Sequence, residues 1–504
     1  MRRAVGRGIL LIFCFTVGRA AAQPVATERF DRPLPVVLDE VAERFGVRIA
    51  CKRFDPDTVT VACAAFRIRP YSLEETLDNV LRPLSLAWTG ESKIVVQPYE
   101  YYRRKPADGA RLLAWLSAQY GDRASWEERR ERLLADLREA LALEPFERGL
   151  APHPRDRFGR EVRRDGYTTR NYAFETLPGL YVCGTIYAPD IDRSRPASLP
   201  LVVAPSGHWA GGRYRADHQL LMIGLARMGA VAVDLDIFGW GESERQIGIE
   251  AHATPYAMQM QALWSKVVTD RVIAACPEVD TTRMAATGGS GGATHALLLA
   301  ALDGRFAALA PVVHLVSHFD GGCPCESGRP VTLAGGGSCL PELLAAAMAP
   351  RPVLTVSDGG DWTATYPELE YPFLRRIWAF YDAADRIRNV HLAGERHDFG
   401  PSKRRAVYDF LGEVLGLDAA RAAERAEDPV GEAELYAFPD GRLPRGAVRS
   451  REELERMIGK LISHSTVLRS DGSRGPQPPP AEARIASLAE PSAGCGPDNR
   501  KVVN

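Results

Sequence analysis

Short apolar runs alternate with segments of helical periodicity through the middle of the chain. Most of these runs are unbroken, as in parallel strands that are covered on both faces. They span residues 201–204, 230–235, 283–287, 308–313, 353–357 and 390–393. Helical stretches separate them, so the pattern predicts a doubly wound α/β domain with a mostly parallel sheet over residues 166–418.

The N-terminal part of the chain has a different pattern, with short helices and strands in a small unit at residues 24–97. Apolar positions recur at helical spacing over residues 34–45, and Ser72 with Glu75 forms a capping box for a second helix. These elements predict a small α+β domain, and they include no catalytic constellation. Its expected strands are 47–50, 59–63, 84–88 and 94–96.

Residues 98–165 form a helical connector between the two domains. Ser125 with Glu128 predicts a capped helix, and a leucine stripe on this helix is expected to pack on the α/β domain. Residues 419–469 form a C-terminal extension with a short helix near 450–462. Residues 470–504 are rich in Pro, Gly and Ser, which is typical of a disordered tail.

The composition is that of an ordinary globular protein. At 504 residues the chain is long enough for two or three domains. A hydrophobic fraction of 45% and a charged fraction of 25% exclude a mainly disordered, collagen-like or membrane-embedded chain. The formal net charge is -1, so no bulk field favours nucleic acid as a partner.

The first residues have the pattern of a secretory signal peptide. Arg2, Arg3 and Arg7 precede a short apolar run at 9–17, and small residues lead to an expected cleavage site after Ala22. The run is shorter than the ~20 residues that a transmembrane helix needs, and no later transmembrane segment is expected. Residues 1–22 therefore predict a periplasmic or secreted protein.

The cysteines suit an oxidising compartment. Cys51 and Cys63 end two adjacent strand-like runs and are candidates for a disulfide bridge. One further disulfide is expected in a cluster of three cysteines. A metal site in the same cluster is the competing interpretation, but its spacing matches no standard zinc pattern, so neither a metal nor an organic cofactor is expected. The residues of this cluster are Cys323, Cys325 and Cys339, with His314 and His318 as the alternative metal ligands.

The strongest chemical signal is a G-x-S-x-G sequence at residues 288–292. A strand-like run precedes it and a helix-forming run follows it, which is the context of a nucleophile elbow. Ser290 is therefore the candidate nucleophile. The alternative is a tight turn in which Ser290 only caps the helix.

A serine nucleophile needs a base and an acid, which follow it in the order acid, histidine in this class of elbow. His397 follows the last apolar run, where the base is expected. Asp361 lies in the loop after the 353–357 run and is the expected acid, with Asp358 and Glu370 as alternatives.

The oxyanion of the intermediate needs two backbone N–H donors. One is expected from Gly291, and the other from the 205–209 loop, at His208 or Trp209. The alternative role of His208 and Trp209 is packing in the wall of the site, and the sequence leaves both interpretations open. Glu326 is a candidate substrate contact, with a loop hydrogen bond or a surface charge as the alternative. The turn at 236–243 resembles the D-x-x-G-x-G-x-S turn of α/β-hydrolases and is expected to be structural.

Residues 170–417 resemble bacterial acetylxylan-esterase-like α/β-hydrolases, relatives of the dienelactone hydrolase and prolyl oligopeptidase groups. This resemblance implies hydrolysis of carboxylic esters by a Ser-His-Asp triad through an acyl-enzyme, with acetylated polysaccharide as the expected substrate. Ser206 departs from the family, which often has histidine before Gly-His. The matching stretches are LPGLYVCGTIYAP, GHWAGGRY, LARMGAVAVDLDIFGWGES, TGGSGGATHALLLAALD, HFDGGCPCESGRP, APRPVLTVSDGGDWT and ERHDFGPSKRRAVYDFL.

Residues 24–97 resemble the secretin and TonB short N-terminal domain in the stretches PLPVVLDEVAERFGVRIAC and VTVACAAFRIRPYSLEETLDNVL. That resemblance implies a periplasmic module that contacts another protein.

Two other functions compete with the esterase. A serine peptidase of the prolyl-oligopeptidase type usually carries a β-propeller, and residues 24–165 are too few for four or more blades of ~40–50 residues. A non-catalytic binding protein on a hydrolase fold is the other rival. A complete triad in chain order argues against it.

Overall fold

The computed structural model describes residues 32–467, except 62–63, 65–66, 82–83, 85, 99–104, 193–196, 255 and 327–336. The chain divides into two compact units, Met1–Val96 and Gln97–Asn504. The expected signal peptide, Cys63 and the expected disordered tail lie outside the described residues, so the Cys51–Cys63 bridge stays a prediction.

The first unit is a small α+β fold. Two helices and a three-stranded sheet surround a core that includes Leu34, Val41, Leu77 and Val96. The second helix begins where the sequence predicts, and the Glu75 backbone N–H donates to Ser72 Oγ over 3.1 Å. The elements are α2 (Leu34–Phe45), α3 (Leu73–Leu81), the sheet β2 (Arg48–Cys51), β5 (Lys93–Pro98) and β4 (Leu86–Thr89), and the pair β1 (Arg32–Pro33) and β3 (Thr60–Val61).

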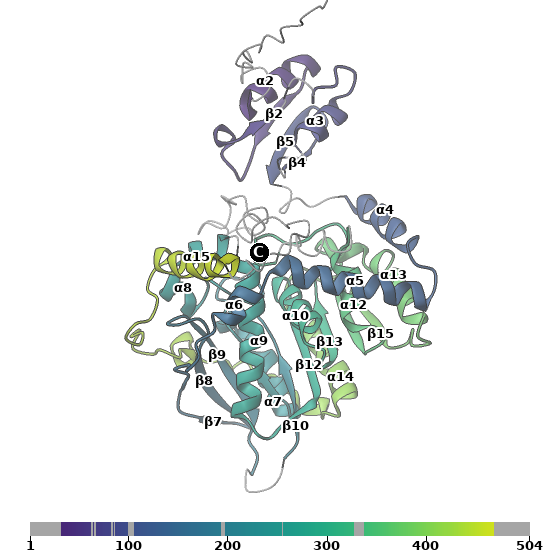
Figure 1. Ribbon diagram of the computed structural model, residues 1–504. Coiled ribbons are helices and arrows are strands. Elements are labelled where there is room, and N and C mark those ends of the chain that lie inside the picture. Colours follow the sequence, from purple (N-terminus) through teal and green to yellow (C-terminus); the bar gives the residue numbers. More distant parts are fainter. Residues whose placement is uncertain are drawn as a thin grey trace, which may run out of the picture. The chain divides into compact units, whose positions relative to one another are not determined.

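The second unit is built on a ten-stranded sheet, drawn in Figure 1. Its six strands from β15 to β11 pair in parallel, as the unbroken apolar runs predict. The fold is therefore that of a doubly wound α/β-hydrolase. The strands, in their order in the sheet, are β15 (Ile387–Leu392), β14 (Val353–Asp358), β13 (Phe306–Val312), β12 (Val279–Gly289), β10 (Leu199–Val203), β11 (Val231–Val233), β9 (Tyr181–Pro189), β8 (Tyr167–Glu175) and β6 (Arg157–Phe158), with β7 (Val162–Arg164) also on β8.

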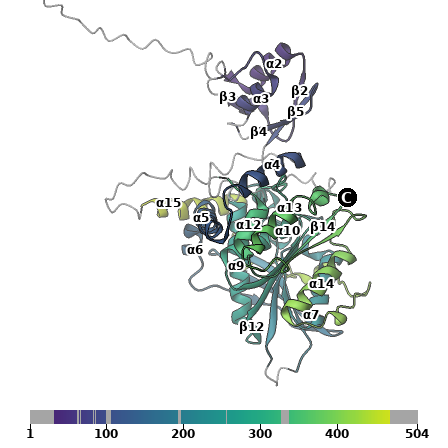
Figure 2. The same ribbon diagram turned by 90° about the vertical axis from the view of Figure 1, so that its right-hand side faces the viewer.

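Helices cover both faces of the sheet, and a separate apolar core lies under each face. The two groups of helices are seen on opposite sides of the sheet in Figure 2. One core is formed with α7 (Ala216–Met228) and α14 (Pro401–Leu415). The other is formed with α9 (Ala257–Ala275), α10 (Gly291–Leu302), α12 (Leu340–Met348) and α13 (Glu370–Ala379).

The antiparallel hairpin β8–β9 extends the sheet beyond β11. Apolar runs alone do not predict it, because the polar residues 168–171 interrupt its first strand. Thr168 and Thr169 are nevertheless buried, and Thr185 Oγ1 donates to Asn171 Oδ1 over 2.9 Å. Hydrogen bonding thus allows a polar strand to be covered.

The connector helices belong to the second unit. They are α4 (Pro106–Ser117), α5 (Arg123–Leu141) and α6 (Glu144–Arg148). The expected cap of α5 is wrong by one turn: Asp122 is the N-cap, and its carboxylate accepts from the Ser125 backbone N–H over 2.9 Å. A buried ion pair of 2.9 Å between Arg129 and Glu342 joins α5 to α12.

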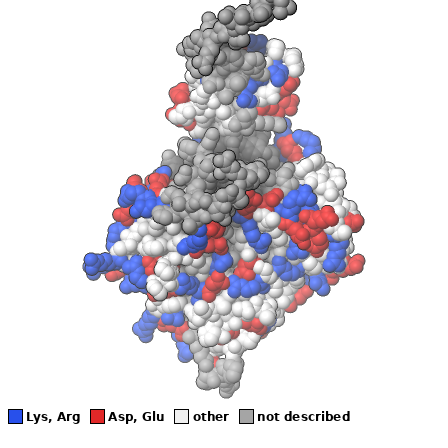
Figure 3. Space-filling view, in the orientation of Figure 1, with Lys and Arg blue, Asp and Glu red and all other residues white. Residues whose placement is uncertain are grey.

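The chain ends, within the described part, in α15 (Arg451–Val467). Among the helices that the structure describes, none has the length and apolarity needed to cross a membrane. Basic and acidic side chains are interspersed on the face in view in Figure 3, in keeping with the net charge of -1.

Candidate active site

Ser290 stands in a sharp turn between β12 and α10. Its backbone has φ 53° and ψ −130°, a left-handed conformation that is strained for any residue with a side chain. Glycines make the turn possible: a Cβ on Gly288 would lie 2.4 Å from the Gly292 carbonyl oxygen, and one on Gly292 would lie 2.4 Å from that of Pro205. Ser290 is the N-cap of α10, but its side chain makes no capping hydrogen bond to this helix.

His397 lies between Ser290 and Asp361. Its Nε2 is 3.0 Å from Ser290 Oγ, and its Nδ1 is 2.6 Å from Asp361 Oδ2. Because an ionised carboxylate only accepts hydrogen bonds, Nδ1 carries the proton, and Nε2 of the neutral ring is left to accept from the serine hydroxyl. Ser290, Asp361 and His397 follow the carboxyl ends of β12, β14 and β15, respectively. In the parallel sheet β14 and β15 are adjacent, and β13 lies between β14 and β12.

Asp361 is itself held in place. Its Oδ1 accepts from the Thr363 backbone N–H and from Thr363 Oγ1, each over 2.6 Å. Burial on its own raises the pKa of Asp361, but the hydrogen bonds from His397 and Thr363 outweigh it and lower the pKa below its ordinary value. The carboxylate is therefore charged at neutral pH and able to orient the imidazole.

The two alternative acids bind other groups. Asp358 is paired with the buried Lys403 ammonium at 3.1 Å, and its pKa is raised by burial and by the charge of Asp361. Glu370 accepts from the backbone N–H and the hydroxyl of Ser317, over 3.0 and 2.6 Å. Of the three candidate acids, Asp361 is the one for which the structure gives a hydrogen bond to His397, over 2.6 Å.

The 205–209 loop packs directly on the elbow. A Cβ on Gly289 would lie 2.7 Å from the Trp209 ring, and one on Gly291 would lie 2.2 Å from His208 Nδ1. The ring centroid of Trp209 is 5.4 Å from that of His397, and the ring centroid of Trp362 is 4.3 Å from that of His397. The loop expected to supply the second oxyanion donor is thus next to Gly291.

Glu326 is buried and turned toward histidines. Its Oε1 accepts from the Gly322 backbone N–H over 2.7 Å, and its Oε2 is 3.5 Å from His208 Nδ1 and 4.0 Å from His314 Nε2. The loop hydrogen bond that the sequence offered as an alternative is present.

The expected disulfide among the three clustered cysteines is wrong, because Cys323, Cys325 and Cys339 are all thiols. Cys323 Sγ and Cys325 Sγ are 3.4 Å apart, far beyond the ~2.05 Å of a disulfide bond. The histidines grouped with Cys323 and Cys325 are His208 and His252, rather than the His314 and His318 of the competing metal interpretation. The spacing of the cysteines did not reveal this set, because its members come from three distant parts of the sequence.

A second group of possible ligands surrounds a side-chain cation. Cys183, Asp236 and Glu242 lie close together, but the Arg213 guanidinium is 2.7 Å from Asp236 Oδ1 and 3.2 Å from Glu242 Oε2. The Glu242 backbone N–H also donates to Asp236 over 2.9 Å. This is the 236–243 turn, and its contacts are those of a structural element.

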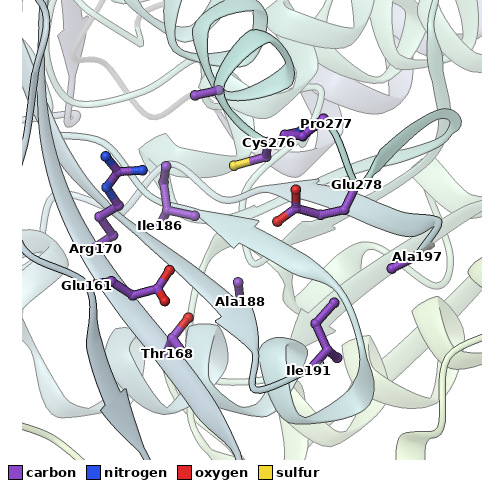
Figure 4. A pocket seen from close by; sticks show the side chains of 11 residues that line it. Glu161, Thr168, Arg170, Ile186, Ala188, Ile191, Ala197, Cys276, Pro277 and Glu278 are labelled. Carbon is purple, nitrogen blue, oxygen red and sulfur yellow. The ribbon is translucent and has the colours of Figure 1, made fainter. Parts of the chain in front are cut away.

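A pocket of about 470 Å³ lies away from the serine (Figure 4). Cys276 and Glu278 in its wall precede the first residue of β12, whereas Ser290 follows the last, a strand of 11 residues away. The pocket therefore lies at the other end of β12 from the elbow. It takes no part in the chemistry of Ser290.

Comparison with known proteins places the chain in a family. The model of the acetyl xylan esterase family matches residues 170–326. The solved structure of methylesterase BT1017 is 44% identical, covers 88% of this chain and 100% of its own, and superposes with a TM-score of 0.73. The chain therefore belongs to the acetyl-xylan-esterase-like family of α/β-hydrolases. It is a carboxylic ester hydrolase.

More distant solved structures also match. An acetyl xylan esterase from Paenibacillus sp. R4 is 17% identical, covers 57% of this chain and 99% of its own, and has a TM-score of 0.39. A glucuronoyl esterase from Solibacter usitatus is 16% identical, with coverages of 60% and 95% and a TM-score of 0.42. No match was found among curated proteins.

Proposed function

We propose that this hydrolase is a serine esterase in which Ser290 is the nucleophile, His397 the base and Asp361 the acid. One observation carries the proposal: the two ring nitrogens of His397 contact both partners. Nε2 is 3.0 Å from Ser290 Oγ, and Nδ1 is 2.6 Å from Asp361 Oδ2. The strained turn at Ser290 supports it, since such strain is typical of a nucleophile elbow.

The reaction has two halves. Ser290 Oγ attacks the ester carbonyl while its proton moves to His397 Nε2, and Asp361 stabilises the resulting imidazolium. His397 then gives this proton to the departing alcohol, which leaves Ser290 acylated. In the second half a water molecule loses its proton to His397, attacks the acyl-enzyme and releases the acid.

The negative oxygen of each intermediate needs donors near Ser290. The backbone N–H of Gly291 is proposed as one, since it follows the nucleophile at the start of α10. The other is proposed from the 205–209 loop, at His208 or Trp209, which packs on Gly291 and Gly289. Glu326 stays a candidate substrate contact, because its Oε2 lies beside the position that a Cβ on Gly291 would take.

Two ester types follow from the comparisons. Acetylated polysaccharide is the first, because the matching family model is that of acetyl xylan esterase. A methyl ester is the second, because the 44% identical structure that covers 88% of this chain is a methylesterase. The two ester types differ in the acyl group that is bound to Ser290 in the acyl-enzyme. With an acetyl ester this group is acetyl and the polysaccharide is the leaving alcohol. With a methyl ester it is the acyl group of the polysaccharide's own carboxylate, and methanol is the leaving alcohol.

Product analysis separates the two. The purified protein is incubated with acetylated and with methyl-esterified polysaccharides, and released acetate and methanol are measured beside a Ser290→Ala control. Acetate without methanol supports the first ester type, and methanol without acetate supports the second. Release of neither, together with no turnover of a chromogenic acetate ester, would contradict the serine esterase proposal.

The setting of the enzyme is proposed from the sequence. The signal-like pattern of residues 1–22 supports a periplasmic or secreted location. The pattern of residues 24–97 supports a module that contacts another protein, as in secretin and TonB short N-terminal domains. The peptidase and the non-catalytic binding protein are disfavoured, since the chain belongs to a family of ester hydrolases.

A further inference from the structure

Four side chains of types that can bind a metal ion converge next to the elbow. They are His208, His252, Cys323 and Cys325, and their ligand atoms all lie within 4.8 Å of one another. His208 follows β10, His252 lies in the short turn Ile249–Ala253, and the cysteines follow β13. His208 is half-buried and the other three are buried. Thus three segments far apart in the sequence each bring soft or borderline ligands to one point.

The distances between these atoms are close to those of a tetrahedral metal site. His208 Nε2 is 3.0 Å from Cys325 Sγ and 3.4 Å from Cys323 Sγ, and the two sulfur atoms are 3.4 Å apart. His252 Nε2 is 3.2 Å from Cys323 Sγ and 3.6 Å from Cys325 Sγ. Bonds of ~2.0 Å to nitrogen and ~2.3 Å to sulfur place tetrahedral ligand atoms about 3.3–3.8 Å apart. The shortest distance here, 3.0 Å, is a few tenths of an ångström below that range, so binding an ion would require a small outward shift of the ligands.

The histidine rings are oriented as metal ligands. His252 Nδ1 lies 2.7 Å from the Phe238 carbonyl oxygen, which can only accept. Nδ1 therefore carries the proton, and the lone pair of the neutral ring is on Nε2, which faces the sulfurs. His208 Nδ1 faces Glu326 Oε2 at 3.5 Å, so its Nε2 also faces the sulfurs. Such a carbonyl or carboxylate behind each imidazole is the usual outer support of a histidine ligand.

We propose that His208, His252, Cys323 and Cys325 bind one Zn²⁺ ion. Two imidazoles and two thiolates suit zinc, which takes mixed nitrogen and sulfur ligands in tetrahedral geometry. Binding releases the two thiol protons to solvent, so that two thiolates balance the charge of the ion. With four protein ligands the site is closed, and the ion has a structural role rather than a catalytic one.

The ion would fix the loops that surround the nucleophile. His208 lies in the 205–209 loop, and its ring lies directly against Gly291, since a Cβ there would be 2.2 Å from Nδ1. Glu326 is adjacent to the ligand Cys325 and also faces His208. His295 of α10 has its Nε2 3.3 Å from Cys325 Sγ, within hydrogen-bond reach of a thiolate there. The metal thus positions the loop that the proposed function assigns to the oxyanion, and that link alone rests on the proposed function.

The test is metal content of the full chain, purified without a metal-binding tag from zinc-supplemented medium. We expect about one zinc per chain by mass spectrometry, and X-ray absorption with two nitrogen and two sulfur neighbours at ~2.0 and ~2.3 Å. Cys323→Ser and Cys325→Ser should each lower the zinc content at least tenfold. The matched control is Cys276→Ser in the distant pocket, which should retain the zinc.

A second measurement uses only the parent protein, so it tests the proposal even if the cysteine variants fail to fold. A chelator applied to the parent protein should remove the zinc, lower Tm and make Cys323 and Cys325 reactive toward a thiol reagent, and added zinc should reverse all three changes. A parent protein without zinc, one that holds a different metal after zinc supplementation, or one with a Cys323–Cys325 disulfide in peptide mapping would overturn the proposal.

The Ser290→Ala variant separates the two proposals. It should retain zinc and lose ester hydrolysis. If the triad is wrong, this variant stays active with zinc bound. If the zinc site is wrong, the parent lacks zinc while Ser290→Ala is still inactive.

Discussion

His397 Nδ1 lies 2.6 Å from Asp361 Oδ2, and Thr363 holds the other oxygen of the same carboxylate. The carboxylate therefore fixes both the orientation of the imidazole and the position of its proton. This relationship distinguishes Asp361 from the two other candidate acids, Asp358 and Glu370, and substitution can separate their roles.

Replacement of Asp361 by asparagine should lower turnover by roughly 10³–10⁴-fold, because the imidazole then loses the acceptor that sets its tautomer. Asp358→Asn is the matched control, since Asp358 is paired with Lys403 at 3.1 Å. It should keep turnover within about tenfold of the parent. Steady-state kinetics on a chromogenic acetate ester measures both. A larger loss in Asp358→Asn than in Asp361→Asn would assign the acid to Asp358.

The lowered pKa of Asp361 predicts a pH dependence of stability. A carboxyl group whose pKa is lower in the folded state stabilises that state above its ordinary pKa of about 4, and this contribution is lost as pH falls through the folded-state pKa. The difference in Tm between the parent and Asp361→Asn should therefore be largest near neutral pH and shrink below about pH 4. A difference that grows in acid would show the opposite sign of the pKa shift.

Gly291→Ala should lower turnover by roughly 10²–10³-fold, the effect of losing one oxyanion donor. The new Cβ would lie 2.2 Å from both Glu326 Oε2 and His208 Nδ1, so the start of α10 has to move. Gly304→Ala is the control, because nothing lies within 4 Å of its added Cβ. Equal activity of the two variants would mean that the backbone at Gly291 is not part of the site.

Deletion of residues 24–97 should leave turnover of a small acetate ester within a fewfold of the full chain. The residues of the triad and of the 205–209 loop all belong to the unit Gln97–Asn504. The deletion stops before α5, whose Arg129 is paired with Glu342 inside that unit. What should change is binding to a cell-envelope protein or to polymer. A truncated protein that folds but has lost small-ester turnover would show that the module helps to build the site.

Local sequence patterns predicted most strands of the hydrolase sheet, and they predicted three candidate residues that the fold brings together. Ser290, His397 and Asp361 each follow an apolar strand, and hydrogen bonds join them in the structure. The polar strand β8 was missed because hydrogen bonding, rather than apolar character, allows its burial. The cap of α5 was misplaced because Asp122 and Ser125 are both good capping residues, and only the backbone geometry decides between them.

The cluster of His208, His252, Cys323 and Cys325 was not predictable from spacing. Its two histidines and two cysteines lie on three loops, and His208 is 117 positions from Cys325. Zinc patterns in sequence depend on ligands that are close together in the chain. Only the doubly wound topology, which brings the ends of β10 and β13 to one edge of the sheet, assembles this set.

The identity of the nucleophile is tested most directly by labelling with a serine-directed phosphonate followed by peptide mapping. The account predicts that the label is found on Ser290, and that Ser290→Ala remains folded, takes up no label and loses about 10⁶-fold in turnover. A label on another serine, or a Ser290→Ala variant with activity within about tenfold of the parent, would contradict it.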